Sequence, residues 1–184
     1  MAISITDDFV LLDQYFSGKD SDRVFSVIVE KYQRPLYSII RKMVINHDDA
    51  RDVLQNTFIK AWKNLPSFNR QSKFYTWLYR IAVNETITFL NARKKRSFIP
   101  LSGQDYDLSD KLETDPWFDG DELQKKFQKA ILTLPHKQRL VFNMRYFEEM
   151  PYEQMSEVLD TSEGALKASY HHAAKKIQDY MLNN

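Results

Sequence analysis

The sequence contains no cysteine and only four glycines, and these two shortages exclude several classes of function. Without cysteine there is no disulfide framework, no thiolate metal site and no cysteine nucleophile, which suits a reducing compartment such as the cytoplasm. The glycines lie too far apart for a phosphate-binding P-loop or a dinucleotide-binding fingerprint. Long apolar runs are also missing, since none approaches the roughly 18 residues of a membrane span. We therefore expect a cytoplasmic protein with no direct membrane insertion.

Candidate catalytic and metal-ligating residues are few. The four histidines include no pair at a chelating spacing, because His171 and His172 are adjacent and would point about 100° apart on a helix. The metalloprotease, nucleophile-elbow and EF-hand motifs are absent. We expect a protein that is not an enzyme and that has no catalytic residue, cofactor or metal.

The net charge of +1 conceals a segregation of charge along the chain. Residues 1–96 contain 16 Lys and Arg against 10 Asp and Glu, and residues 123–184 contain 9 against 7. Residues 97–122 contain 1 against 8, together with two prolines and two glycines, and show no helical period. We interpret this acidic segment as a flexible linker, so the two basic lobes need not touch.

Outside the linker, apolar residues recur every three or four positions, which predicts helices throughout. Thr6 is the expected cap of the first helix, and Pro35 should kink or break the second. The predicted fold class is all-α, with a four-helix domain over residues 1–96 and a second small helical domain over residues 123–184. The expected helices cover residues 6–17, 22–45, 48–65, 73–95, 121–133, 135–147, 152–159 and 163–181.

The last two of these helices have the layout of a helix-turn-helix. Met155, Leu159, Leu166 and Tyr170 would pack the pair together, leaving polar residues of the final helix to face a DNA groove. The alternative is a helical hairpin whose charges are only solvated. Because the final helix is weakly basic, with three lysines and no arginine, phosphate contacts alone should give it modest affinity.

Two further stretches carry a functional pattern. Residues 67–80 alternate aromatic with polar or basic side chains, as in surfaces that stack unpaired bases and hold a nucleic-acid backbone. Some of these rings must be core, Trp77 above all, whereas the polar loop 68–73 favours nucleic-acid contact. The helix at residues 48–62 has a polar face beside its apolar stripe, which is either a solvated face or a docking surface for another protein.

Together these stretches resemble bacterial sigma factors. Residues 48–62 are similar to the core-polymerase-binding region 2.2. The Phe-Tyr-Thr-Trp-Leu-Tyr-Arg-Ile-Ala-Val-Asn run at 74–84, with the loop before it, resembles the promoter-melting and −10-reading regions 2.3 and 2.4. Residues 134–177 resemble region 4, the helix-turn-helix that reads the −35 element. Two sigma domains joined by a linker are the layout of the extracytoplasmic-function (group 4) subfamily.

The resemblance implies a transcription-initiation factor that binds core RNA polymerase and promoter DNA and has an anti-sigma factor as a further partner. The loop at 67–73 would capture a base flipped out of the non-template strand. The residues implied in core-polymerase binding are Asp49, Asp52, Val53, Gln55, Asn56, Phe58, Ile59 and Trp62. Those implied in −10 binding are Phe68, Asn69, Arg70, Ser72, Lys73, Phe74, Tyr75, Trp77, Arg80 and Asn84. Those implied in −35 binding are Ser162, Glu163, Gly164, Lys167, Ala168, Ser169, His171, His172 and Lys175.

This chain departs from the family in its recognition helix, where Ser169, His172 and Ala174 replace frequent arginines, so the −35 contact should be weaker or tuned to another sequence. Two other functions remain open. A stand-alone helix-turn-helix regulator would bind operators as a dimer without polymerase, but it leaves the acidic linker and the aromatic-basic loop unexplained. A sigma mimic that titrates a regulator would keep the helix at 48–62 and tolerate loss of Arg70, Lys73, Arg80 and Asn84.

Overall fold

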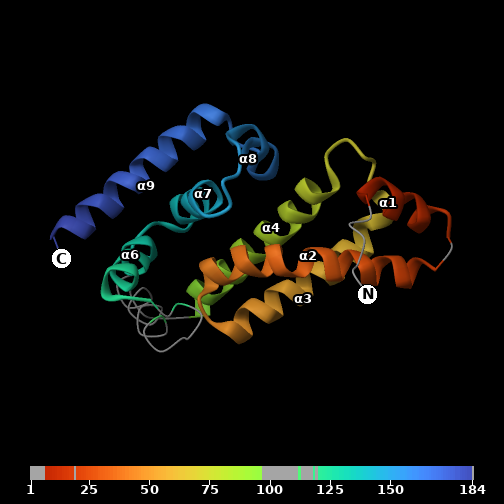
Figure 1. The fold of residues 1–184 in the computed structure, drawn as a ribbon, viewed down its shortest axis with the longest axis horizontal. Helices are drawn as coiled ribbons and strands as arrows, with labels where there is room; N and C mark the ends of the chain where they lie inside the picture. The colour runs from red at the N-terminus through yellow and green to blue at the C-terminus, as the bar shows by residue number, and fades with distance from the viewer. Residues whose placement is uncertain (1–6, 19, 97–111, 113–117, 119, 184) are drawn as a thin grey trace.

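The computed structural model describes residues 7–18, 20–96, 112, 118 and 120–183, and within them every regular element is a helix. The all-α prediction is confirmed. In the described part of the chain, four α-helices precede the linker and four follow it (Figure 1). Their bounds are α1 (Asp8–Phe16), α2 (Ser21–Val44), α3 (His47–Asn64), α4 (Phe74–Arg96), α6 (Glu122–Leu132), α7 (His136–Tyr146), α8 (Tyr152–Leu159) and α9 (Glu163–Asn183), with a 3₁₀ turn, η1 (Leu65–Ser67), after α3.

Two local expectations need correction. The cap of α1 is Asp7, whose carboxylate accepts a hydrogen bond from the backbone N–H of Phe9 at 3.1 Å, while Thr6 lies outside the described residues. Helix α2 continues through Pro35, so of the two expected effects, a kink or a break, the break is wrong. Because Tyr32 and Leu36 on either side are buried, tertiary packing holds the helix together despite the missing donor.

The first domain is built around α2. Its apolar stripe packs against α1, α3 and α4, and Ile28, Leu36 and Ile40 are completely buried. Apolar burial of this kind is the main driving force that keeps the four helices together.

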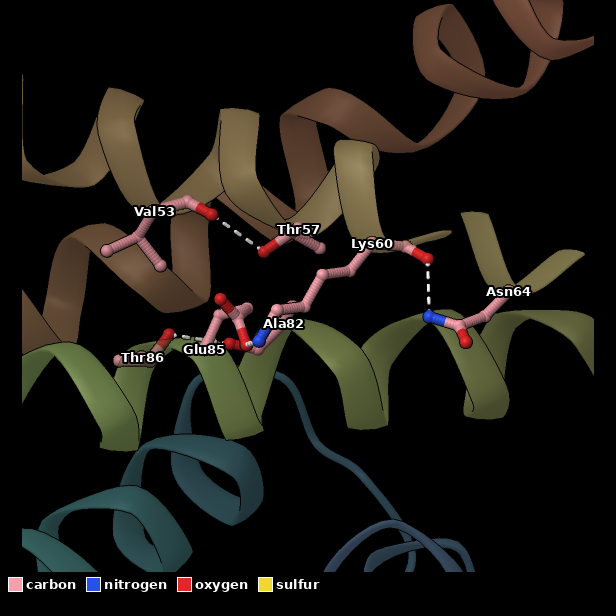
Figure 2. A network of polar contacts seen from close by, with 7 residues as sticks. All are labelled: Val53, Thr57, Lys60, Asn64, Ala82, Glu85 and Thr86. Carbon is pink, nitrogen blue, oxygen red and sulfur yellow. Dashed lines mark hydrogen bonds and ion pairs between the residues drawn. The ribbon is translucent and has the colours of Figure 1, made fainter. Parts of the chain in front are cut away.

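The seam between α3 and α4 also contains polar groups (Figure 2). The buried hydroxyls of Thr57 and Thr86 donate to the carbonyls of Val53 and Ala82, at 2.8 and 2.7 Å. These bonds satisfy hydroxyls that would otherwise be costly to bury. At the solvent edge of the seam, Lys60 of α3 forms an ion pair with Glu85 of α4.

The second domain has its own small core where α6, α7 and α9 meet. Phe142 of α7 stacks between Tyr146 and Tyr170, with ring centroids 5.1 and 5.6 Å away and interplanar angles of 14° and 11°. Ala130 and Ala173 are fully buried beside it. Aromatic stacking thus fixes α9 on α7.

The two domains are in contact, although a flexible linker would have allowed them to stay apart. Helix α7 packs on α2 and α8 packs on α4, and one buried apolar cluster runs through both domains. Leu112 and Phe118, the described residues of the expected linker before Gly120, are buried against Ile45 of the first domain and Leu132 of the second. Most of the linker lies outside the described residues. The reason for the contact is apolar: Met144, Met150 and Met155 of the second domain are buried in the shared cluster.

Candidate protein and nucleic-acid interfaces

An apolar groove of about 460 Å³ lies between α2 and α3. Four of the residues predicted to bind core polymerase line it, namely Gln55, Phe58, Ile59 and Trp62. The Ile59 side chain is 44% exposed, which is high for so large an apolar residue. Among the described residues, those that line the groove all belong to α2 and α3, and none comes from the second domain. An exposed apolar surface of this kind is typical of a protein-binding site.

The other predicted residues of α3 lie elsewhere. Val53 is 2% exposed and belongs to the core, so it supports the helix instead of facing a partner. Asp49 forms an ion pair with Arg93 of α4 at 3.2 Å, which ties the two helices together. Asp52 and Asn56 are exposed on the polar face of α3, outside the groove lining.

Sequence reasoning missed the α2 wall of the groove, formed by Phe25, Val29 and Gln33. These residues are spaced by four, so they share one face of a helix. That spacing was a signal, but it runs beside the stronger buried stripe of Val24 and Ile28 and was hidden by it.

The loop that precedes α4 holds the predicted −10 residues from Phe68 to Lys73, and the other five lie in α4. The loop differs from the expectation at its first position. Phe68 was expected to be exposed, yet its ring is 7% exposed and packs against Phe74 and Trp77 at centroid distances of 5.6 and 5.1 Å. Three aromatic rings thus form the floor of the loop, and burial of apolar surface is the reason. Asn69, Arg70 and Lys73 are exposed above this floor.

Arg70 is held from the side by α1. Its guanidinium forms an ion pair with Asp13 and lies 5.5 Å from the centre of the Phe16 ring. Its backbone has a φ of 59°, in the left-handed region that non-glycine residues rarely adopt. The side-chain contacts therefore stabilise a loop conformation that the backbone alone would disfavour.

A cavity of about 550 Å³ opens beside this loop, within the range of small-molecule pockets. Its walls come from three parts of the chain: the loop with the start of α4, the α1 region, and Glu157 of α8. Helix α1 is fixed there by Asp8, which accepts hydrogen bonds from Lys31 at 2.7 Å and from the Tyr32 hydroxyl. Neither the α1 wall nor the α8 contribution was predicted, because both depend on contacts distant in sequence.

Further along α4, Arg80 and Asn84 are both exposed, one helical turn apart, as predicted for residues that read a duplex edge. Arg80 is not free, since its guanidinium donates a hydrogen bond to the backbone carbonyl of Glu157 in α8. Trp77 is half-buried in the ring cluster, in line with its expected core role.

The predicted −35 surface is the outer side of α9. The helix-turn-helix interior is as expected, with Met155 and Leu166 buried and Leu159 and Tyr170 partly buried beside them. Ser162 caps α9 by accepting from the backbone N–H of Ala165 at 3.3 Å. Of the other predicted residues, Ser169 is half-buried and the rest are exposed: Glu163, Gly164, Lys167, Ala168, His171, His172 and Lys175.

Three tyrosines, near the loop at residues 68–73 (the −10 loop) and the contact between the two domains, have raised pKa values. Burial raises the pKa of Tyr75 to about 12, and the charge of Glu148 adds to the effect. Burial likewise raises the pKa of Tyr79 well above its usual value. The pKa of Tyr32 is also raised, first by burial and then by its hydrogen bond to Asp8. All three hydroxyls stay protonated at neutral pH.

Among the described residues, no cluster of His, Asp or Glu side chains could hold a metal ion. The described helices include none with the length and apolar character needed to cross a membrane.

Comparison with known proteins identifies both halves of the chain. The family model described as Sigma-70 region 2 matches residues 28–96, and that described as Sigma-70, region 4 matches residues 124–177. The ECF RNA polymerase sigma-E factor of Haemophilus influenzae is 27% identical over 187 residues, with 97% of each chain covered. The RNA polymerase sigma-H factor of Pseudomonas aeruginosa is 32% identical over 171 residues, with 84% of each chain covered.

A solved structure shares the fold. It is the co-crystal structure of the sigma factor RpoE in complex with the anti-sigma factor NepR from Bartonella quintana. The TM-score is 0.64 at 22% identity, and the match covers 87% of this chain and 98% of that one. The resemblance seen in the sequence is confirmed by the two family models and the full-length relatives. The chain belongs to the sigma-70 family, within the ECF group of RNA polymerase sigma factors.

Proposed function

We propose that this sigma factor directs RNA polymerase to promoters with three separate surfaces: the α2–α3 groove for core polymerase, the −10 loop with α4, and the outer side of α9 for the −35 element. The first two belong to a domain over residues 1–96 and the third to a domain over residues 123–184. The observation that carries the proposal is the groove, because four residues of α3, in the segment that resembles region 2.2, line one apolar groove.

Core polymerase is the partner that the groove fits best. Ile59 and Trp62 offer apolar contact in its lining, and Arg51, Gln33 and Gln55 supply hydrogen-bonding groups in the same lining. A mixture of apolar and hydrogen-bonding groups is usual in a protein interface. The exposed Asp52 lies on the same helix and adds a charge for docking.

The −10 element would be bound by the loop and the adjacent face of α4. Arg70 and Lys73 supply positive charge for the DNA backbone, and the cavity beside the loop could receive an unpaired base. Phe68 and Phe74, being buried, would support this surface from below without touching DNA.

The −35 element would be read by α9, where His171, His172 and Lys175 are exposed. Lys167 is shared between Glu163, at 3.0 Å, and the Tyr152 ring. Its charge is therefore partly offset before DNA arrives, which agrees with a −35 contact of modest affinity.

The proposed factor acts in the cytoplasm and is not an enzyme. It has an anti-sigma factor as a regulatory partner, as does the Bartonella quintana sigma factor of similar fold, and the same apolar groove is open to such a partner.

The decisive experiment is transcription in vitro with purified core polymerase, with and without this chain, on templates carrying a randomised promoter region. We expect promoter-dependent initiation only when both are present, and the enriched templates define the promoter. A DNA shift by the chain alone, with no stimulation of polymerase, would instead show a stand-alone regulator. Neither activity would indicate a protein-interaction module.

The groove is tested by Ile59→Glu, which places a charge in its apolar lining. We expect core-polymerase affinity to fall by about 10- to 100-fold, the range of a hot-spot residue. Val10→Glu is the matched control, because Val10 is 46% exposed on α1, outside the groove lining. Equal affinities of the two variants, measured by titration with labelled protein, would place the docking surface elsewhere.

A further inference from the structure

Helix α1 presents two large aromatic side chains to solvent beside the −10 loop (Figure 1). Phe9 is 63% exposed and Phe16 is 43% exposed. They are seven positions apart, so they lie on the same side of the helix. Phe9 lines the cavity beside the loop, and the Phe16 ring contacts Arg70 of the loop. This aromatic side of α1 therefore adjoins the surface proposed to bind the −10 element.

Helix α1 lies outside the segment that matches the region 2 model, since that segment begins at residue 28. The residues predicted to contact the −10 element all come later in the chain as well. A role of α1 in DNA binding thus has to be argued from its own contacts.

The position of Phe9 is fixed by the residues around it. Its neighbour Asp8 accepts hydrogen bonds from Lys31, at 2.7 Å, and from the Tyr32 hydroxyl, both of α2. Just after it, Leu11 and Leu12 are buried in the core. The backbone of α1 is thus anchored on either side of Phe9, so its ring meets a ligand with little loss of conformational entropy.

Charge is divided between two walls of the cavity. Arg70 and Lys73, both exposed, supply positive charge on the loop wall. The α1 wall has the Phe9 ring together with Asp7 and Asp8. Carboxylates repel a phosphate, whereas an aromatic ring stacks on a base. A nucleotide in the cavity would therefore direct its phosphate toward the loop and its base toward α1.

We propose that α1 is part of the promoter-binding surface, and that the Phe9 ring stacks on an unpaired base of the non-template strand beside the −10 loop. Every base has a face that can stack, so Phe9 adds affinity for single-stranded DNA with little preference for one base. Glu157 of α8 also lines the cavity and is acidic, so it adds no site for a phosphate. This inference rests on the proposed role of the loop.

The test uses the holoenzyme, formed from the full-length chain and saturating core polymerase. Phe9→Leu keeps an exposed apolar side chain but removes the ring, and Phe9→Trp restores a ring. Val10→Ala is the matched control, because Val10 is also exposed on α1 but does not line the cavity. Fluorescence anisotropy measures binding of a single-stranded −10 non-template oligonucleotide and of a −35 duplex, both from a promoter selected by the wild-type holoenzyme.

We expect Phe9→Leu to bind the −10 strand at least about fivefold more weakly than the wild type, the loss of one base stacked on an aromatic ring. Phe9→Trp and Val10→Ala should bind it as the wild type does, and all variants should bind the −35 duplex equally. A further set of −10 probes has an abasic nucleotide at one position at a time, which removes the base and keeps the phosphate. At the position that stacks on Phe9, the wild type and Phe9→Leu should bind the abasic probe equally.

Lys73→Ala separates this inference from the proposed function, because it tests the loop alone. If Lys73→Ala weakens binding of the −10 strand and Phe9→Leu does not, the inference is overturned while the proposed −10 surface stands. If neither variant weakens it, both fail. A Phe9→Leu defect that persists with every abasic probe, or that affects only the affinity for core polymerase, would also overturn the inference.

Discussion

Arg70 shows how one residue can be predicted correctly as exposed and basic while its environment stays hidden from sequence. Its ion pair with Asp13 and its contact with Phe16 link residues more than fifty positions apart. The exposed pair adds little to stability, since such pairs are worth about 0–1 kcal/mol. We therefore interpret these contacts as positioning the −10 loop, with the remaining charge available to the DNA backbone.

At the same scale, Tyr75 makes a pH-dependent contribution to stability. Its ring stacks on Tyr32 with centroids 5.7 Å apart, and burial raises its pKa to about 12. In the unfolded chain the pKa of a tyrosine is about 10. Between pH 10 and 12 the folded state therefore retains the proton of Tyr75, while the unfolded state loses it. The stabilising effect is complete below pH 10 and is lost as the pH rises to 12.

Tyr75→Phe removes this titration. We expect its free energy of unfolding to fall less steeply between pH 10 and 12 than that of the wild type, by at most about 1.4 kcal/mol per pH unit. Tyr32 and Tyr79 act with the same sign and remain, so the slope should flatten without vanishing. Urea denaturation at a series of pH values measures the effect, and an unchanged slope would contradict it.

Among the elements, the start of α9 combines two roles at one residue, a structural role in capping the helix and a proposed role in DNA recognition. Ser162 was predicted from the family resemblance as a −35 contact, and the structure makes it the cap of the helix. The two roles are compatible, because a side chain can cap a helix while its exposed edge faces DNA. They respond differently to substitution.

Ser162→Ala removes the cap and should lower the free energy of unfolding by about 1 kcal/mol. Ser162→Asp keeps a capping oxygen but brings a negative charge to the DNA-facing side, so we expect near-normal stability and a several-fold lower affinity for the −35 duplex. Thermal denaturation and anisotropy together distinguish these results. Loss of stability in both variants, or unchanged −35 affinity in Ser162→Asp, would contradict this assignment.

Helix α3 also combines a structural role with a proposed binding role, on two different sides of the helix. The buried side, with Val53 and Thr57, builds the seam against α4, whereas Ile59 opens into the groove. Periodicity predicted the helix and its stripe, but it could not say which apolar residues remain exposed. That depends on how far α2 and α3 approach each other, which neither helix specifies alone.

For the whole molecule, the contact between the two domains predicts a change of shape when one charge of an ion pair across it is reversed. This pair joins Lys42 of α2 to Glu148, in the turn between α7 and α8, at 2.8 Å. Lys42→Glu sets two carboxylates against each other in a partly buried site, which is unfavourable. We expect a larger radius of gyration by small-angle X-ray scattering. The double variant Lys42→Glu/Glu148→Lys should restore the compact form.

Lys60→Glu is the matched control, because it reverses a charge in an ion pair confined to the first domain. Its radius of gyration should equal that of the wild type. A radius of Lys42→Glu no larger than that of Lys60→Glu would show that the ion pair does not hold the domains together.

The order of residues along the chain was enough to predict the helices, their approximate bounds, the two basic lobes and the three ordered motifs that identify a sigma factor. These features are local: helical periodicity, capping residues and composition are written in consecutive positions. Three features became visible only in the folded chain: Phe68 is buried, Phe25 and Val29 complete the groove, and α8 lies on α4. Those outcomes depend on which apolar surfaces meet across long separations in the chain. The hydrophobic effect is not directional, so the apolar pattern of one helix does not specify which other helix it packs against.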